Sequence, residues 1–64
     1  MMYEAAGKIY AECDKFEDAA RCFFDAKIWH TAGEYYERVK NYTKAAEAYT
    51  NGGYCDIVID LMQR

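Results

Sequence analysis

The feature that most constrains this chain is a pattern of aromatic and small residues that recurs about every 13 residues. In each of the first four units, an aromatic residue is followed by small residues three and four positions later, and by another ring at the seventh. The four units are Tyr3, Ala6, Gly7, Tyr10; Phe16, Ala19, Ala20, Phe23; Trp29, Ala32, Gly33, Tyr36; and Tyr42, Ala45, Ala46, Tyr49. A fifth unit, read as starting one residue early, has Tyr54, Ile57, Val58 and Leu61. Self-similarity at a fixed period is typical of repeat architectures, so we expect a repeat fold.

The spacing within each unit defines one face of an α-helix. Proline, which would break a helix, does not occur in the chain. The units predict helices near residues 3–13, 16–26, 29–39, 42–51 and 54–63. Joints of two or three residues force neighbouring helices to run antiparallel. We therefore expect residues 1–64 to form one all-α segment of five short antiparallel helices, arranged as stacked αα-hairpins.

Local signals for the helix ends are uneven along the chain. Asp14, with Glu17 three residues later, has the spacing of a capping box, and Asn41 is expected to cap the fourth helix. The run Asn51-Gly52-Gly53 supplies residues that can adopt positive φ and end a helix. The eight repeat aromatics of the first four units are expected in the core, and Cys13 extends their stripe. The rings expected to be exposed are Phe24, Tyr35 and Tyr54.

Composition argues against several classes of function. The net charge is −3, from 11 acidic and 8 basic residues, and no basic stripe is visible, so nucleic-acid binding is not expected. No apolar run approaches the roughly 20 residues of a membrane-spanning helix, and the start, MMYEAAGK, lacks the features of a secretory signal. The three cysteines have no ligand spacing, which favours reduced thiols and an intracellular, cytoplasmic protein.

No catalytic, cofactor-binding or metal-binding motif is present, so we expect no enzymatic activity and no cofactor. The chain contains no serine, and its glycines do not form a phosphate-binding loop. His30 is the only histidine and has no partner at metal-ligand spacing; it is expected to face solvent. The acidic residues are expected to form ordinary helix-surface pairs, such as Glu4 with Lys8 and Glu34 with Arg38.

The repeat resembles the tetratricopeptide repeat, whose first helix carries W-x2-L-G-x2-Y and whose second carries A-x3-F. The matching residues are Trp29, Ala32, Gly33, Tyr36, Ala45 and Tyr49 in one copy, and Tyr3, Ala6, Gly7, Tyr10, Ala19 and Phe23 in another. The chain departs from the family in three ways. Alanine replaces leucine, the terminal proline is missing, and two units span 26 residues where the family uses 34. The chain looks like the compact arrays of vesicle-coat and intraflagellar-transport subunits, or helicase-associated segments.

The resemblance implies a binding groove and no chemistry. In the family, the first helix of each hairpin lines a concave groove that binds peptides. The positions that would face such a groove are Glu4, Lys8, Ala11, Glu12, His30, Glu34, Glu37 and Arg38. This mixed, acid-leaning face suits a basic or polar peptide.

Three readings of the function remain open. The chain is a non-catalytic protein-interaction module, a spacer within a larger, helicase-like enzyme, or a designed or excised repeat fragment. For the isolated chain we expect self-association through an incompletely covered fifth helix, with Tyr54, Ile57, Val58 and Leu61 as the contact face.

Overall fold

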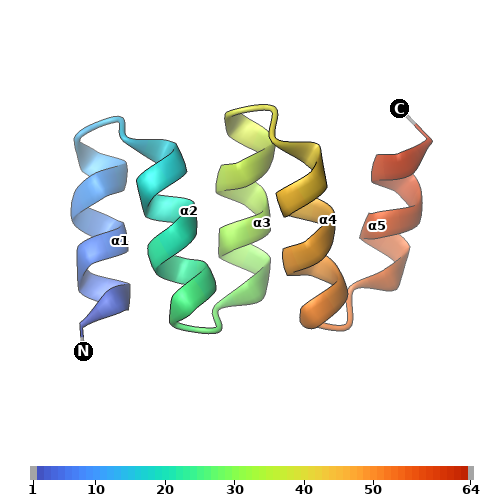
Figure 1. The fold of residues 1–64 in the computed structure, drawn as a ribbon, viewed down its shortest axis with the longest axis horizontal. Helices are drawn as coiled ribbons and strands as arrows, with labels where there is room; N and C mark the ends of the chain where they lie inside the picture. Colours follow the sequence, from blue (N-terminus) through green and yellow to red (C-terminus); the bar gives the residue numbers. More distant parts are fainter. Residues whose placement is uncertain (1, 64) are drawn as a thin grey trace.

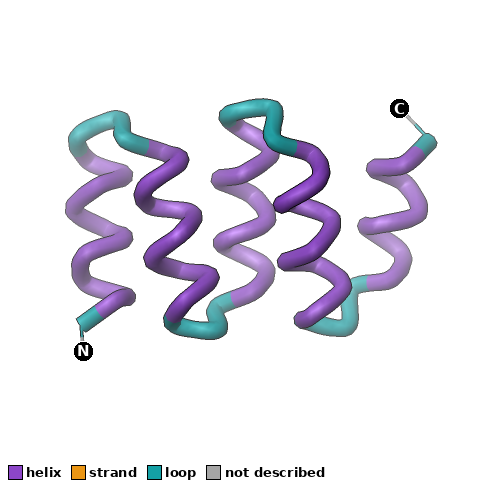
Figure 2. The backbone as a smooth tube through the Cα atoms, in the orientation of Figure 1, coloured by secondary structure: helices purple, strands orange, loops and turns teal. Residues whose placement is uncertain are grey.

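The computed structural model describes residues 2–63, which form five α-helices joined in a zigzag (Figure 1). The helices are α1 (Tyr3–Glu12), α2 (Phe16–Asp25), α3 (Trp29–Arg38), α4 (Tyr42–Asn51) and α5 (Cys55–Met62). Consecutive helices are antiparallel and each packs against the next, giving a backbone that measures 32 × 20 × 12 Å. In Figure 2, α2 and α4 lie nearer the viewer than α3 and α5, so the array has two layers. This is the all-α arrangement of stacked hairpins that the periodicity predicts.

The helices begin at a constant interval. Their first residues are Tyr3, Phe16, Trp29, Tyr42 and Cys55, each 13 residues after the one before. The expectation that the fifth unit starts early, at Tyr54, is wrong, because Tyr54 occupies the N-cap position. Three of the first four helices also end one residue sooner than predicted, since the residue after the last helical one already belongs to the turn.

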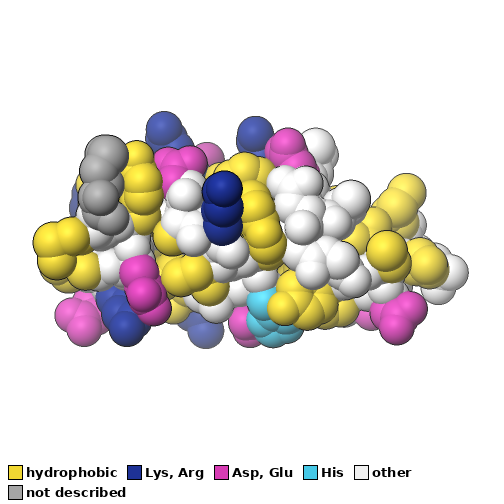
Figure 3. Space-filling view, turned by 90° about the horizontal axis from the view of Figure 1, so that it is seen from below, with side chains coloured by type: hydrophobic (Ala, Val, Ile, Leu, Met, Phe, Trp, Pro, Cys, Tyr) yellow, Lys and Arg dark blue, Asp and Glu magenta, His cyan; other side chains and the backbone are white. Residues whose placement is uncertain are grey.

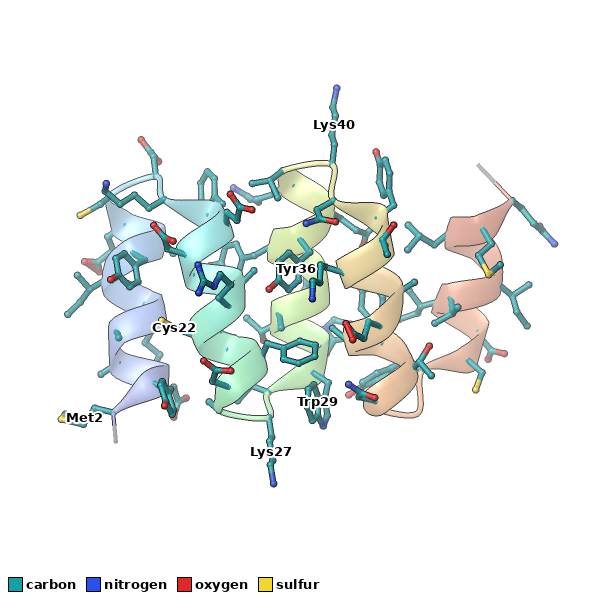
Figure 4. The ribbon with its side chains drawn as sticks, in the orientation of Figure 1. Met2, Cys22, Lys27, Trp29, Tyr36 and Lys40 are labelled. Carbon is teal, nitrogen blue, oxygen red and sulfur yellow. The ribbon has the colours of Figure 1, made fainter. Side chains whose placement is uncertain are left out.

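All four joints use the same backbone turn to end a helix. The second residue of each joint has positive φ: Asp14 at 62°, Lys27 at 64°, Lys40 at 61° and Gly53 at 80°. In each joint the next amide donates back to the carbonyl of the ring that closes the unit, at Tyr10, Phe23, Tyr36 and Tyr49, over 2.8–2.9 Å. This is the Schellman arrangement, which satisfies carbonyls that the helix itself leaves unpaired. Figure 4 shows the Lys27 and Lys40 side chains projecting from opposite edges of the array.

The predicted caps have different outcomes. Asn41 caps α4 as expected, because its Oδ1 accepts a hydrogen bond from the Lys44 amide at 3.3 Å. The capping box at Asp14 is wrong: Lys15 is the N-cap of α2, and no side chain caps that helix. Asp14 instead supplies the positive φ of the preceding turn. Asp14 cannot both form the turn that ends α1 and cap α2, and in the structure it forms the turn.

The non-glycine residues at positive φ predict a stabilising substitution. An L-residue in the left-handed region costs about 1–2 kcal/mol, whereas glycine adopts it without that penalty. We therefore expect Lys40→Gly to raise the free energy of unfolding by about 0.5–1 kcal/mol, after allowing for the greater flexibility of glycine in the unfolded chain. Gly53→Ala should lower it by a similar amount, since no atom lies within 4 Å of the added Cβ and only the backbone is affected. Urea unfolding of both variants checks the opposite signs; equal signs would contradict the argument.

The core follows a simple packing rule: the ring that closes one unit lies against the small residue of the preceding helix. A Cβ added at Gly7 would lie 2.9 Å from the Phe23 ring, and one added at Gly33 would lie 2.6 Å from the Tyr49 ring. Tyr36 shares a buried cluster with Ala20 in the same way. Small residues let adjacent helix backbones approach, and the ring of the next helix fills the remaining space.

Five expectations about individual side chains are wrong. Tyr10 and Tyr42, assigned to the core, are 38% and 49% exposed. Within residues 2–63, no helix precedes α1 to cover Tyr10. Phe24 and Tyr35, expected to be exposed, are partly buried and pack against both core clusters. Cys13, placed on the apolar stripe, is exposed because α1 has already ended at Glu12.

Burial of Tyr36 predicts a loss of stability in alkali. Its side chain is 4% exposed, and burial raises the pKa of its hydroxyl above the usual 10.0; nearby Asp25, Glu17 and Glu47 add to this, and Arg21 opposes it. The folded state holds this proton more tightly than the unfolded state. The protonated Tyr36 hydroxyl therefore makes its full contribution to the free energy of unfolding below about pH 10, and this contribution is lost as pH rises through the raised pKa. Urea unfolding at about pH 8 and about pH 11 measures how far the free energy of unfolding falls between the two pH values. We expect a smaller fall in Tyr36→Phe than in the parent protein. Equal declines would contradict the prediction.

Candidate functional site

A hollow of about 470 Å³ lies where the ends of α1, α2 and α3 meet, and we call it the α1–α3 hollow. Its lining residues are Lys8, Ala11, Glu12, Phe16, Tyr35 and Arg38. A smaller hollow of about 120 Å³ adjoins it along α3 and shares Tyr35 and Arg38, adding Thr31 and Glu34. The packing of α1 and α3 on either side of α2 brings residues 27 positions apart in sequence (Lys8 and Tyr35) to one site.

Aromatic rings line the hollow. Tyr35 stacks on Phe16, with ring centroids 5.7 Å apart and planes at 11°, and on Phe23, at 5.6 Å and 9°. Tyr35 lies one position before the closing ring of its unit, on the side of α3 that packs against α2. Stacked rings of this kind contribute about 0.5–1.5 kcal/mol per pair beyond their buried area, so the stacking stabilises the aromatic lining of the hollow.

The charges around the hollow are arranged differently from the predicted helix-surface pairs. The Arg38 guanidinium lies over the Phe16 ring, 4.9 Å from its centroid, and 6.0 Å from that of Tyr35. The predicted Glu34–Arg38 pair is therefore wrong; Glu34 Oε1 lies 2.9 Å from His30 Nδ1 instead. The predicted Glu4–Lys8 pair forms, but its atoms are 3.9 Å apart and both side chains are mostly exposed. Such a pair contributes little.

The structure brings together part of the predicted groove face. Lys8, Glu12 and Arg38 line the α1–α3 hollow, and Glu34 lines its extension. Glu4 lies outside both hollows, one helical turn before Lys8.

The other two predicted positions contact α4. The His30 side chain is 47% exposed, and its ring edge meets Tyr49 and Tyr54 at centroid distances of 5.9 and 5.1 Å. Glu37 accepts a hydrogen bond from the Tyr49 hydroxyl at 2.6 Å. The aromatic lining of the hollow, by contrast, was missed by sequence reasoning. The signal available for it was the second tyrosine of the Tyr35-Tyr36 pair, which places a ring beside the repeat stripe.

The face predicted for self-association is largely covered by α4. Leu61 is buried at 7% exposure, so the expectation that it is bare is wrong, and Ile57 and Val58 pack against the same cluster. Tyr54 is exposed, as expected. The large apolar side chains left open on α5 are instead Ile59 and Met62, at 55% and 78%.

Apolar side chains are also exposed at Met2, the N-cap residue before α1, and at Ile9 on α1. Figure 3 shows hydrophobic side chains at both ends of the array and also along its middle, while most charged side chains lie along its long edges. Self-association stays a prediction, with Ile59 and Met62 as its contact residues on α5. We expect Ile59→Lys to reduce the light-scattering mass of the concentrated protein towards the monomer value. The control variant Asp60→Lys should keep the higher mass of the parent protein. A parent protein that is monomeric at all concentrations would refute the prediction.

Residues 2–63 contain no group of three or more His, Cys, Asp and Glu side chains that could hold a metal ion. The three cysteines are free thiols. Within the same part of the chain, each helix is too short or too polar to cross a lipid bilayer.

Comparison of the chain with protein-family models, with curated proteins and with solved structures finds no match. The arrangement of five consecutively packed short helices is compatible with a helical-repeat fold.

Proposed function

We propose that this chain is a tetratricopeptide-like segment of a helical array that binds a peptide or a protein segment in the α1–α3 hollow. The observation that carries the proposal is the stacked pair of rings, Phe16 and Tyr35, which lines a hollow together with charged side chains. Binding sites of this kind combine apolar surface for affinity with a few polar groups for orientation.

The repeat supports the same proposal. The two hairpins, α1–α2 and α3–α4, use the same glycine-to-ring contact, at Gly7–Phe23 and Gly33–Tyr49. Equivalent hairpins packed side by side place their first helices next to each other on one face, which creates an extended surface. The hollow lies between these two first helices, where the resemblance predicts a groove.

Selection of peptides from a displayed random library on the purified chain tests the proposal. We expect selected peptides to shift the backbone amide resonances of Ala11 and Tyr35, and to lose affinity in Arg38→Glu. Arg21→Glu is the matched control, because Arg21 is also an exposed arginine but lines a different depression, with Tyr10 and Asp25. Binding that survives Arg38→Glu and fails in Arg21→Glu would place the site elsewhere.

The alternative is a spacer that holds other parts of a larger enzyme apart. It is favoured by the elongated arrangement, in which each helix packs mainly on its sequence neighbours. A selection that yields no peptide for the hollow would support the spacer and end the binding proposal.

A further inference from the structure

We infer that the α1–α3 hollow takes a peptide segment that carries a side-chain carboxylate next to an apolar residue. The inference rests on the proposed binding function and names the chemistry of the partner. It differs from the expectation, drawn from the acid-leaning face as a whole, that a basic or polar peptide is bound.

The carboxylates of that face are largely engaged within the chain. Glu37 accepts from the Tyr49 hydroxyl, and Glu34 lies against the His30 ring nitrogen. Glu4 lies near Lys8 and outside the hollow. The charged groups that line the hollow itself are Lys8, Arg38 and Glu12, two cations and one anion. Lys8 is itself loosely paired with Glu4, and Glu34 lines the adjoining hollow, so the two hollows together carry balanced charge although the chain has a net charge of −3.

Arg38 is positioned to receive an anion. No carboxylate among residues 2–63 lies within ion-pair distance of its guanidinium, which is held over the Phe16 and Tyr35 rings. The contact with the rings places the guanidinium beside the hollow, and a guanidinium carries N–H donors along its edges. Those edges match the two oxygens of a carboxylate, and the prior ordering of the side chain reduces the entropy lost on binding.

The apolar part of the hollow fits the residue next to that carboxylate. Phe16 and Tyr35 present ring surface and Ala11 a methyl group, and an aliphatic side chain can lie against this open apolar surface. Lys8, on the α1 side of the hollow, adds a second positive charge. A nucleic acid would offer anions as well, but it would approach a chain with 11 acidic residues, whose repulsion disfavours a long polyanion.

Short peptides with acetylated and amidated ends test the inference, since blocked ends leave only side-chain charges. One peptide alternates leucine with glutamate, a second has glutamine in place of glutamate, and a third has lysine. Titration calorimetry measures affinity, and the amide shifts of Ala11 and Tyr35 locate the binding. We expect the glutamate peptide to bind about tenfold more tightly than the glutamine peptide at low salt, as one charge-assisted hydrogen-bonded pair would give.

Variants assign the preference to Arg38. Arg38→Gln should bring the glutamate-to-glutamine affinity ratio close to one, Lys8→Gln should lower it less, and Arg21→Gln should leave it unchanged. Thermal melts confirm that each variant is folded. A ratio that survives Arg38→Gln, or tighter binding of the lysine peptide or of a single-stranded oligonucleotide, would overturn the inference.

The peptides distinguish a failure of the binding function from a failure of the carboxylate preference. If the glutamate and glutamine peptides shift the same hollow amides with equal affinity, the binding function stands and the carboxylate preference is wrong. If none of the peptides shifts those amides, while the displayed library also yields no ligand for the hollow, both are wrong.

Discussion

Tyr49→Ala is expected to abolish the folded state at room temperature. Tyr49 is the largest fully buried side chain, at 1% exposure, and its ring fills the space above Gly33. Its edge contacts Tyr54 at a centroid distance of 6.2 Å, and its hydroxyl donates to Glu37. One side chain therefore joins α3, α4 and the joint before α5.

Removing a buried ring of this size costs about 3–5 kcal/mol. A core in a chain this short rarely supplies more than about 3–5 kcal/mol in total, so the variant has no stability left. Far-ultraviolet circular dichroism and a thermal melt measure the result: we expect low helicity and no cooperative transition.

Two other tyrosine variants serve as controls for this prediction. Tyr49→Phe keeps the ring and loses only the hydroxyl, so it should cost about 1.5–3 kcal/mol, the range for a hydrogen bond to a charged group. Tyr42→Ala removes a ring from the same helix that is 49% exposed and should cost much less. A cooperative melt for Tyr49→Ala within a few degrees of the parent would show that the array does not depend on this ring.

Gly33→Ala is expected to destabilise the protein, although alanine is the better helix former. The added Cβ would lie 2.6 Å from the Cε1 and Cζ atoms of Tyr49, closer than carbon atoms can approach. The ring cannot swing away because it is buried and its hydroxyl is held by Glu37. Overpacking of this kind costs about 1–3 kcal/mol, which outweighs the gain of about 1 kcal/mol in helix propensity.

Gly7→Ala is the matched comparison, since Gly7 holds the same position in the first hairpin. Its added Cβ would lie 2.9 Å from the Phe23 ring, so a smaller shift relieves the contact. We expect guanidinium unfolding to rank the parent above Gly33→Ala, with Gly7→Ala between them or near the parent. If Gly33→Ala were the more stable of the two variants, the packing rule of ring against glycine would be wrong.

Most of the fold could be predicted from the repeat because its period carries helical geometry. Rings and small residues at helical spacing have one arrangement in which both are buried, with the small residue of one helix facing the ring of the next. The starts of α1 to α4 follow directly from Tyr3, Phe16, Trp29 and Tyr42. The fifth start could not be placed, because Cys55 is not aromatic and Tyr54 stands beside it.

The candidate site was only partly predictable. Lys8, Glu12, Glu34 and Arg38 were expected on the groove face from their helix register, and they line the two hollows. Side-chain direction over a few ångströms, however, depends on neighbouring helices. An arginine four residues after a glutamate predicts an ion pair, but the Phe16 ring on α2 offers Arg38 an alternative that local sequence does not reveal.

The sequence by itself determined the helices and their antiparallel order, because the period carries helical spacing and the joints are too short for any other order. The tertiary structure decided which repeated residues are covered, so that Tyr10 is open at one end while Tyr49 is enclosed. It also decided the local charge of the hollow, because Glu34 and Glu37 contact other side chains while Arg38 lies stacked over rings. Burial and pairing depend on residues brought together from different helices, and the repeat pattern does not contain those distances.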